Sequence, residues 1–186
     1  MQKREITATK QKGLGIGDIL LIGILLAAGV VLKFFVGSMF TFVKPNFIIA
    51  MYCLIILLIR PRLHEALIIG ILSGAVCQFF PGTPYINFIS ETLGALSMFL
   101  FVKFPIRIKK FSLTPILGTF VSTLISGLVF VGVLYLAIAG GAVNAAAAPM
   151  FTVFLATVLG TALINAVIVQ LLYLPLRLAL KKEELA

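Results

Sequence analysis

Charged residues are scarce in this chain. Only 11% of its 186 residues are Asp, Glu, Lys or Arg, whereas 61% are hydrophobic, and its mean hydropathy is +1.19. A soluble domain averages about 25% charged and about 45–50% apolar residues. A soluble fold of this length would have too little polar surface to cover so much apolar side chain. The composition therefore favours a membrane protein whose outer face contacts lipid.

The sequence also lacks the motifs of common enzymes and motors. It has no Gly-x-x-x-x-Gly-Lys-Ser/Thr phosphate loop and no Gly-x-Ser-x-Gly nucleophile elbow. The single histidine, His64, has no second histidine at helical spacing, which excludes a zinc peptidase motif. Two cysteines, Cys53 and Cys77, both in apolar segments, are too few for a disulfide framework or a zinc site, and we expect inert buried thiols. We expect neither an enzyme nor a cofactor.

Long apolar runs follow one another along the chain. A transmembrane helix needs about 20 mainly apolar residues, and turn signals such as Arg60-Pro61-Arg62 separate the runs. No Ala-x-Ala-like site closes the first run, so a cleaved signal peptide is not indicated. Asp18 is the expected N-cap of the first helix. The sequence predicts an all-α integral membrane protein, a compact bundle of six transmembrane helices at 18–35, 45–59, 67–80, 88–104, 115–138 and 149–180.

The basic residues predict the orientation of these spans. With the N-terminus in the cytoplasm, all of the 15 Lys and Arg residues lie on the cytoplasmic side except Lys33 and Lys44. The net charge of +9 does not favour a nucleic-acid partner, because the basic clusters lie between apolar spans without an aromatic-basic platform. We predict cytoplasmic segments at 1–17 and 181–186 and a transmembrane domain at 18–180.

Polar residues gather at the predicted outer face. Glu91 is the one acidic residue within an outer-half apolar span, and an intramembrane carboxylate is a functional candidate by default. A pocket there would suit a small amphipathic ligand, with Lys44 and Glu91 facing the ligand's carboxylate and amine and with aromatic walls around it. The alternative is that the loop residues meet water and that Asn and Thr join helices. The candidate binding residues are Lys44, Asn46, Gln78, Tyr85, Asn87, Glu91 and Asn165.

Small residues recur at four-residue spacing in three of the predicted helices. In lipid, such stripes let helix backbones approach closely. We expect most of them to pack helices within the subunit and an exposed one to dock a partner helix. The stripes are Gly23/Ala27, Gly118/Ser122/Ser126 and Ala156/Gly160.

The order of several motifs resembles that of a known family. Lys44-Pro45-Asn46 precedes an apolar helix that Arg60-Pro61-Arg62 closes. Gly70-Ile71-Leu72-Ser73-Gly74 is followed by Phe80-Pro81-Gly82 and Asn87-Phe88-Ile89, and later by Asn165 and Tyr173-Leu174-Pro175. Together these motifs resemble the substrate-binding (S) components of energy-coupling factor (ECF) transporters, most closely the tryptophan-type (TrpP) group, from about the first span to the end of the chain.

The resemblance implies a six-helix bundle in a bacterial plasma membrane that captures tryptophan or a related aromatic compound from outside. It also implies a membrane coupling protein and two ATPases on other chains, in keeping with the missing phosphate loop. First helices of this family carry an Ala-x-x-x-Ala docking motif, and the nearest counterparts here are Gly23, Ala27 and Ala28. The chain departs from the tryptophan group at Ser90-Glu91, where that group has an acidic-basic pair, and a reversed pocket charge would alter which ligand ion is favoured.

Three alternatives remain open on the sequence. The first is an autonomous small transporter or channel, the second is an S component for another vitamin-like ligand, and the third is an assembly protein without a small ligand. The first would need an ion relay, for which Glu91 would have to serve alone.

Overall fold

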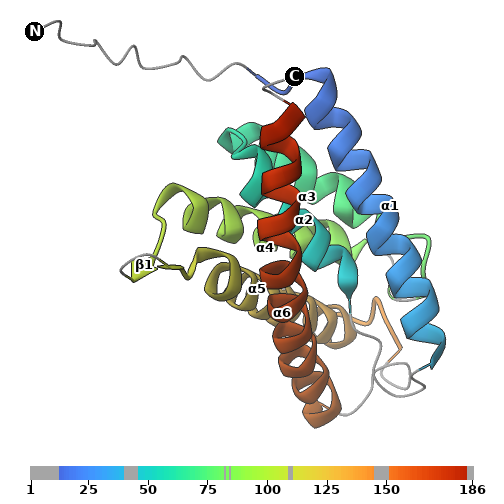
Figure 1. Ribbon diagram of the computed structural model, residues 1–186. Coiled ribbons are helices and arrows are strands. Elements are labelled where there is room, and N and C mark those ends of the chain that lie inside the picture. The colour runs from blue at the N-terminus through green and yellow to red at the C-terminus, as the bar shows by residue number, and fades with distance from the viewer. Residues whose placement is uncertain are drawn as a thin grey trace, which may run out of the picture.

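Six helices and one short hairpin make up the described part of the chain. The structure, a computed structural model, describes residues 13–39, 46–81, 83, 85–108, 111–144 and 151–183. The two strands pair antiparallel, with Arg107 opposite Ser112. In chain order the elements are α1 (Ile16–Met39), α2 (Phe47–Ile59), α3 (Leu63–Cys77), α4 (Ile86–Lys103), β1 (Arg107–Ile108), β2 (Phe111–Ser112), α5 (Thr114–Ala139) and α6 (Phe151–Glu183) (Figure 1).

Helix α2 forms the centre of the bundle. Every residue from Phe47 to Leu57 is buried, and α2 contacts each of the other five helices. A helix that is apolar on all sides is stable only inside a core or in lipid. The neighbouring helices therefore supply the apolar surroundings of α2.

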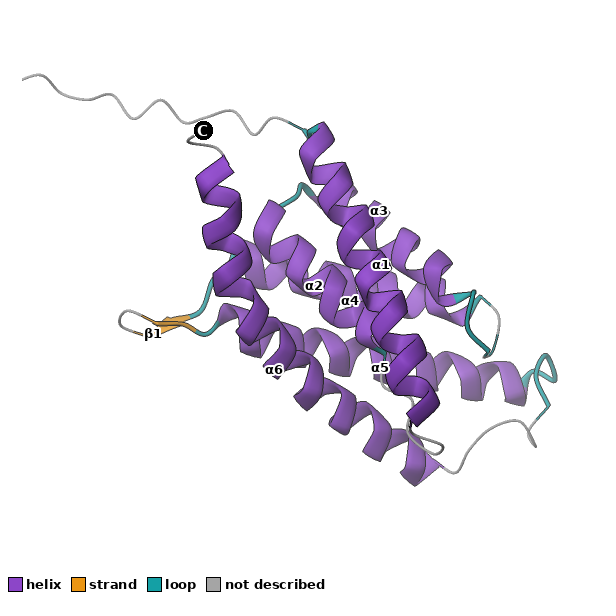
Figure 2. Ribbon diagram, turned by 45° about the vertical axis from the view of Figure 1, so that its right-hand side comes forward, coloured by secondary structure: helices purple, strands orange, loops and turns teal. Residues whose placement is uncertain are grey.

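Two ends of the bundle can be distinguished. One end carries the start of α1, the turn between α2 and α3, the β1–β2 hairpin and the last turns of α6 (Figure 2). The C-terminal ends of α1, α3 and α5 lie at the other end (Figure 2). We refer to these as the hairpin end and the α1 C-terminal end.

The prediction of an all-helical bundle is confirmed, apart from the two-residue strands, which the sequence does not predict. Four helical segments are long and apolar enough to cross a membrane: Ile16–Val36, Ile86–Lys103, Thr114–Ala139 and Phe151–Leu180. The apolar helices α2 and α3 are shorter, with 13 and 15 residues. The count of six spans and their orientation stay predictions.

Several helix ends differ from their predicted positions. Helix α3 begins at Leu63 rather than at 67, because Glu65 Oε2 accepts a hydrogen bond from Arg62 N at 2.7 Å and caps the first turn. Asp18 is not the N-cap of α1: it lies in the first turn, where its Oδ2 accepts from Gly15 N at 2.8 Å. Helix α6 continues through Pro175 to Glu183.

Close backbone approach joins α3 to α4. A Cβ at Gly70 would lie 2.7 Å from Thr92 Cα, and one at Gly74 would lie 2.8 Å from Phe88 Cα. Neither neighbour is a flexible side chain, so only glycine fits at these two positions. The sequence did not assign a packing role to this pair.

The predicted small-residue stripes differ in their surroundings. A Cβ at Gly118 would lie 3.0 Å from Met98 Sδ, and Ser122 and Ser126 are buried. That stripe packs inside the subunit as predicted. A Cβ at Gly23 or Gly160 would meet no atom within 4 Å, so the other two stripes do not pack against the described part of this chain at those glycines.

Candidate functional site

Glu91 lies inside the bundle on α4, with 1% of its surface exposed. Its Oε1 accepts a hydrogen bond from Asn46 Nδ2 at 2.7 Å, and its Oε2 accepts one from Ser126 Oγ at 3.1 Å. Cys77 Sγ lies 3.9 Å from Oε1. Residues from α3, α4, α5 and the N-cap of α2 thus converge on one carboxylate. A carboxylate buried in an apolar bundle requires such donors.

Lys33 brings α1 to the same place. Its Nζ lies 3.8 Å from Cys77 Sγ and 4.6 Å from the centre of the Phe80 ring. The side chain is partly buried. In the described segments no carboxylate oxygen lies within 4.0 Å of this ammonium group.

Asn165 adds α6. Its Nδ2 donates a hydrogen bond to the main-chain carbonyl of Asn46 at 3.1 Å and lies 3.5 Å from Thr123 Oγ1. Asn165 Oδ1 is buried and has no hydrogen-bond partner among the residues described, and the same holds for the Tyr52 hydroxyl on α2. Most buried polar atoms in proteins are paired. These two atoms are exceptions, and each keeps hydrogen-bonding capacity that the described residues do not use.

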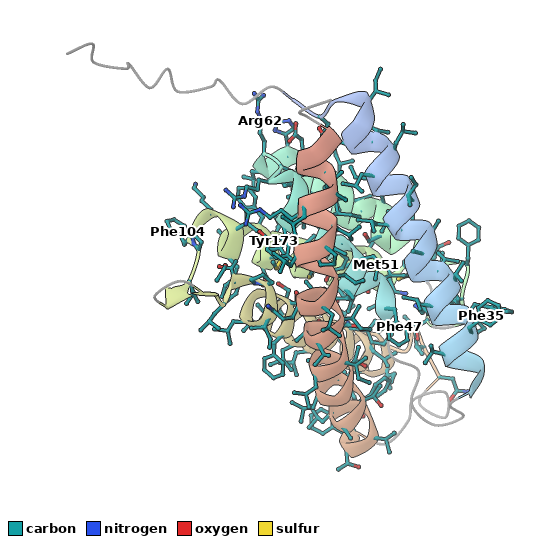
Figure 3. The ribbon with its side chains drawn as sticks, in the orientation of Figure 1. Phe35, Phe47, Met51, Arg62, Phe104 and Tyr173 are labelled. Carbon is teal, nitrogen blue, oxygen red and sulfur yellow. The ribbon has the colours of Figure 1, made fainter. Side chains whose placement is uncertain are left out.

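We name this group of side chains the Glu91 cluster. It lies toward the α1 C-terminal end, because Asn46 directly precedes Phe47, which sits between α1 and α6 far from Arg62 (Figure 3). The cluster contains one acid and one base, together with amide, hydroxyl and thiol groups. Its members are Lys33, Asn46, Cys77, Glu91, Ser126 and Asn165.

Three of the predicted binding residues belong to this cluster: Asn46, Glu91 and Asn165. Each comes from a different part of the chain, and hydrogen bonds connect all three. Lys44 lies outside the described residues. Whether these side chains bind a ligand stays a prediction.

Three other predicted residues lie at the connection between α3 and α4. Gln78 Nε2 donates to Gly74 O, and Gln78 Oε1 accepts from Tyr85 N, both at 3.2 Å. The Tyr85 side chain is 74% exposed, and Asn87 is partly buried. Gln78 therefore closes the turn with both ends of its amide, and the structure brings none of the three into hydrogen-bond contact with the cluster.

Sequence reasoning did not place Lys33, Cys77 and Ser126 in the site. The sequence predicts an outer basic residue at Lys33, an inert thiol at Cys77 and a packing residue at Ser126. Cys53 and Cys77 are free and buried, as predicted, but Cys77 lies between two charged groups. The signal for Lys33 was present, because it is a lone charge within an apolar span.

The groups of the cluster are ones that can bind a small molecule. In the part of the chain that the structure describes, no three His, Cys, Asp or Glu side chains lie close enough to hold a metal ion. The available groups are hydrogen-bond donors and acceptors inside an apolar enclosure, the combination found in sites for small amphipathic molecules.

Comparison with known families identifies the chain. A family model described as "Tryptophan transporter TrpP" matches residues 16–181, from the start of α1 to the last turn of α6. The chain belongs to the tryptophan transporter TrpP family. The resemblance drawn from the motifs is thereby confirmed. No curated protein and no solved structure matches the chain. TrpP is a family of transporters rather than enzymes, and with four long apolar helices this TrpP chain is a multi-pass membrane protein.

Proposed function

We propose that this chain is the substrate-capture subunit of an ECF-type ATP-driven importer, and that it binds tryptophan or a related aromatic compound from the outer face. The observation that supports this function most is the Glu91 cluster. Family membership supplies the ligand class, and the cluster supplies buried polar atoms toward one end of an apolar bundle. The candidate ligand contacts are Asn46, Glu91 and Asn165 in the cluster, together with Lys44, Gln78, Tyr85 and Asn87, which the sequence predicts at the outer face.

The proposed topology has six spans and both termini in the cytoplasm, in the bacterial plasma membrane. The distribution of Lys and Arg supports this orientation. In this orientation the hairpin end faces the cytoplasm. Helix α2 has 13 residues, and it would therefore be about 20 Å long. Because α2 is enclosed by other helices, lipid does not have to match its length.

The proposed partners are a membrane coupling protein and two ATPases. The sequence contains no phosphate loop, so an importer driven by ATP would have its nucleotide sites on other chains. This division assigns ligand capture to the present chain and energy conversion to its partners.

The absence of tryptophan from the chain gives a direct test of binding. With no Trp residue in the protein, the fluorescence of bound tryptophan is free of protein tryptophan emission. Titration of the detergent-purified protein is expected to show saturable binding of tryptophan and weaker competition by phenylalanine. Mass spectrometry of co-purifying small molecules is an independent measurement. No binding of tryptophan and a different co-purifying molecule would contradict the proposed ligand.

Reconstitution tests the subunit model. Uptake into proteoliposomes is expected to require the coupling protein, both ATPases and ATP hydrolysis. Uptake by this chain alone, driven by an ion gradient, would contradict the model and favour an autonomous transporter. The autonomous transporter is the second candidate function. It is supported by the burial of Glu91, the acidic residue of the cluster, because an intramembrane carboxylate can relay protons.

A further inference from the structure

We infer that Lys33 recognises a carboxylate on the ligand, so that the site selects molecules with a free carboxylate over their amides, esters and decarboxylated amines. This inference rests on the proposed function, because it requires the ligand to bind at the Glu91 cluster. It adds Lys33 on α1 as a specificity-determining residue and names the ligand carboxylate as the group that this residue binds.

The first argument is the unfulfilled bonding capacity of Lys33. An ammonium group has three donors, but its neighbours in the described part of the chain are Cys77 Sγ at 3.8 Å and the Phe80 ring at 4.6 Å. A thiol is a weak acceptor, and an aromatic face attracts a cation without neutralising it. A charge on an apolar membrane helix is costly unless it is paired. A ligand carboxylate would supply a direct hydrogen-bonding partner, which no carboxylate of the described residues does.

The second argument is the direction of the side chain. A lysine near the end of a transmembrane helix normally extends its charged group toward water. Lys33 lies within the last two turns of α1, but its ammonium contacts Cys77, which is 1% exposed. The ammonium therefore points into the bundle rather than toward the membrane surface.

The third argument separates the role of Lys33 from that of Glu91. Both carboxylate oxygens of Glu91 already accept hydrogen bonds from within the chain, at 2.7 and 3.1 Å, and Glu91 is almost fully enclosed. Cys77 Sγ lies 3.8 Å from Lys33 Nζ and 3.9 Å from Glu91 Oε1, between the two charges. Glu91 is thus a positioning counter-charge that stabilises the ammonium, whereas Lys33 has donors that the described residues do not fill and that a ligand could use. This inference removes Glu91 from the candidate ligand contacts, and it differs from the sequence-based expectation, in which Lys44 faces the carboxylate and Glu91 faces the amine.

The experiment is a ligand series on the wild type and two variants. Tryptophan, tryptophanamide, tryptamine and indole-3-propionate are titrated against wild type, Lys33→Gln and Lys103→Gln. Lys103 is a matched control at the hairpin end, where its ammonium lies 5.9 Å from the Phe104 ring. Wild type is expected to bind tryptophan about 10- to 150-fold more tightly than tryptophanamide, the range for one charged hydrogen bond.

The expected result for Lys33→Gln is loss of this preference. Its affinity for tryptophan falls to near that of wild type for tryptophanamide, its affinity for tryptophanamide is little changed, and Lys103→Gln retains the wild-type preference. Equal binding of tryptophan and tryptophanamide by wild type would overturn the inference without use of any variant, as would full discrimination by a folded Lys33→Gln protein. If wild type binds none of the four compounds, the proposed function fails, and that outcome is distinct from the other two.

Discussion

Asn165 on α6 donates its side-chain amide to the main-chain carbonyl of Asn46, 3.1 Å away and 119 residues earlier in the chain. Asn46 is the N-cap residue of α2, and its own side-chain amide donates to Glu91 on α4. Asn46 therefore connects the start of the central helix α2 to α4 and to α6. Disturbing either bond is expected to alter the geometry of the whole cluster.

Replacing Asn165 by leucine tests the structural part of this connection. Asn165→Leu keeps a similar volume but removes the donor, and the loss of the hydrogen bond is expected to cost about 1–3 kcal/mol of unfolding free energy. Thermal unfolding in detergent measures the change. Gln170→Leu removes an exposed amide from the same helix and is expected to shift the midpoint little. Equal shifts for the two variants would show that the bond to Asn46 does not stabilise the bundle.

Replacing Glu91 by glutamine tests the buried charge. Glu91→Gln preserves shape, but its amide nitrogen cannot accept a hydrogen bond, and Lys33 loses its counter-charge. Tryptophan binding is expected to weaken by about 10- to 150-fold, which corresponds to loss of one charged interaction, and ATP-dependent uptake should fall in parallel. The autonomous-transporter alternative predicts intact binding with loss of proton-coupled uptake.

Glu65→Gln is the matched control for that experiment. Glu65 is also a buried carboxylate, and its oxygens accept hydrogen bonds from Leu14 N and Arg62 N near the hairpin end. This variant is expected to lower the unfolding temperature while leaving tryptophan affinity unchanged. An equal loss of affinity in both variants would mean that Glu91 acts through stability alone.

A double-mutant cycle tests the packing beside the cluster. A Cβ at Gly94 would collide with the Tyr52 hydroxyl and lie 3.0 Å from Ser126 Cβ, so Gly94→Ala is expected to cost about 1–3 kcal/mol of unfolding free energy. Tyr52→Phe removes a buried hydroxyl that has no partner among the described residues. The phenylalanine variant is expected to be near neutral alone and to restore much of the stability lost in Gly94→Ala.

The same cycle has a built-in control. A Cβ at Gly132 on α5 would meet no atom within 4 Å, so Gly132→Ala is expected to be neutral or slightly stabilising, because alanine is the better helix former. Strict additivity of Gly94→Ala and Tyr52→Phe would contradict the proposed clash, since residues in contact show a coupling term.

The sequence predicts the helices well because their causes are local. Apolar runs and Pro or Gly punctuation place all six, and α3 begins earlier than predicted because Arg62 N donates a hydrogen bond to Glu65 Oε2. Asn46, Glu91 and Asn165 were also identifiable, because a polar side chain in an apolar span must find a partner. These features require no knowledge of how the helices rotate against one another.

Contacts between distant residues are harder to predict. The partner of Lys33 lies 44 residues away on α3, and which face of α1 turns toward α3 depends on the packing of the whole bundle. The sequence predicts an inert thiol at Cys77 for the same reason. The sequence alone also does not distinguish Gly74, whose Cβ would strike α4, from Gly23, whose Cβ would meet nothing within 4 Å.

The exposed stripe on α1 is the proposed docking surface for the coupling protein. Gly23, Ala27 and Ala28 are exposed and lie beside Leu20 and Ile24, which are 61% and 66% exposed. Small residues on a lipid-facing helix let another helix approach closely. Gly23→Leu fills this stripe without touching the rest of the described chain, so folding and tryptophan binding are expected to be unchanged.

Association with the coupling protein is the property that Gly23→Leu should alter. A leucine at a close helix contact overpacks it at a cost of about 1–3 kcal/mol, which corresponds to about 5- to 150-fold weaker association. Co-purification with a tagged coupling protein measures this, and ATP-dependent uptake should fall with it. Gly160→Leu on α6, where a Cβ would likewise meet no atom within 4 Å, is the control. Both substitutions add the same bulk. If the two variants associate equally well with the coupling protein, the α1 stripe contacts lipid rather than this partner.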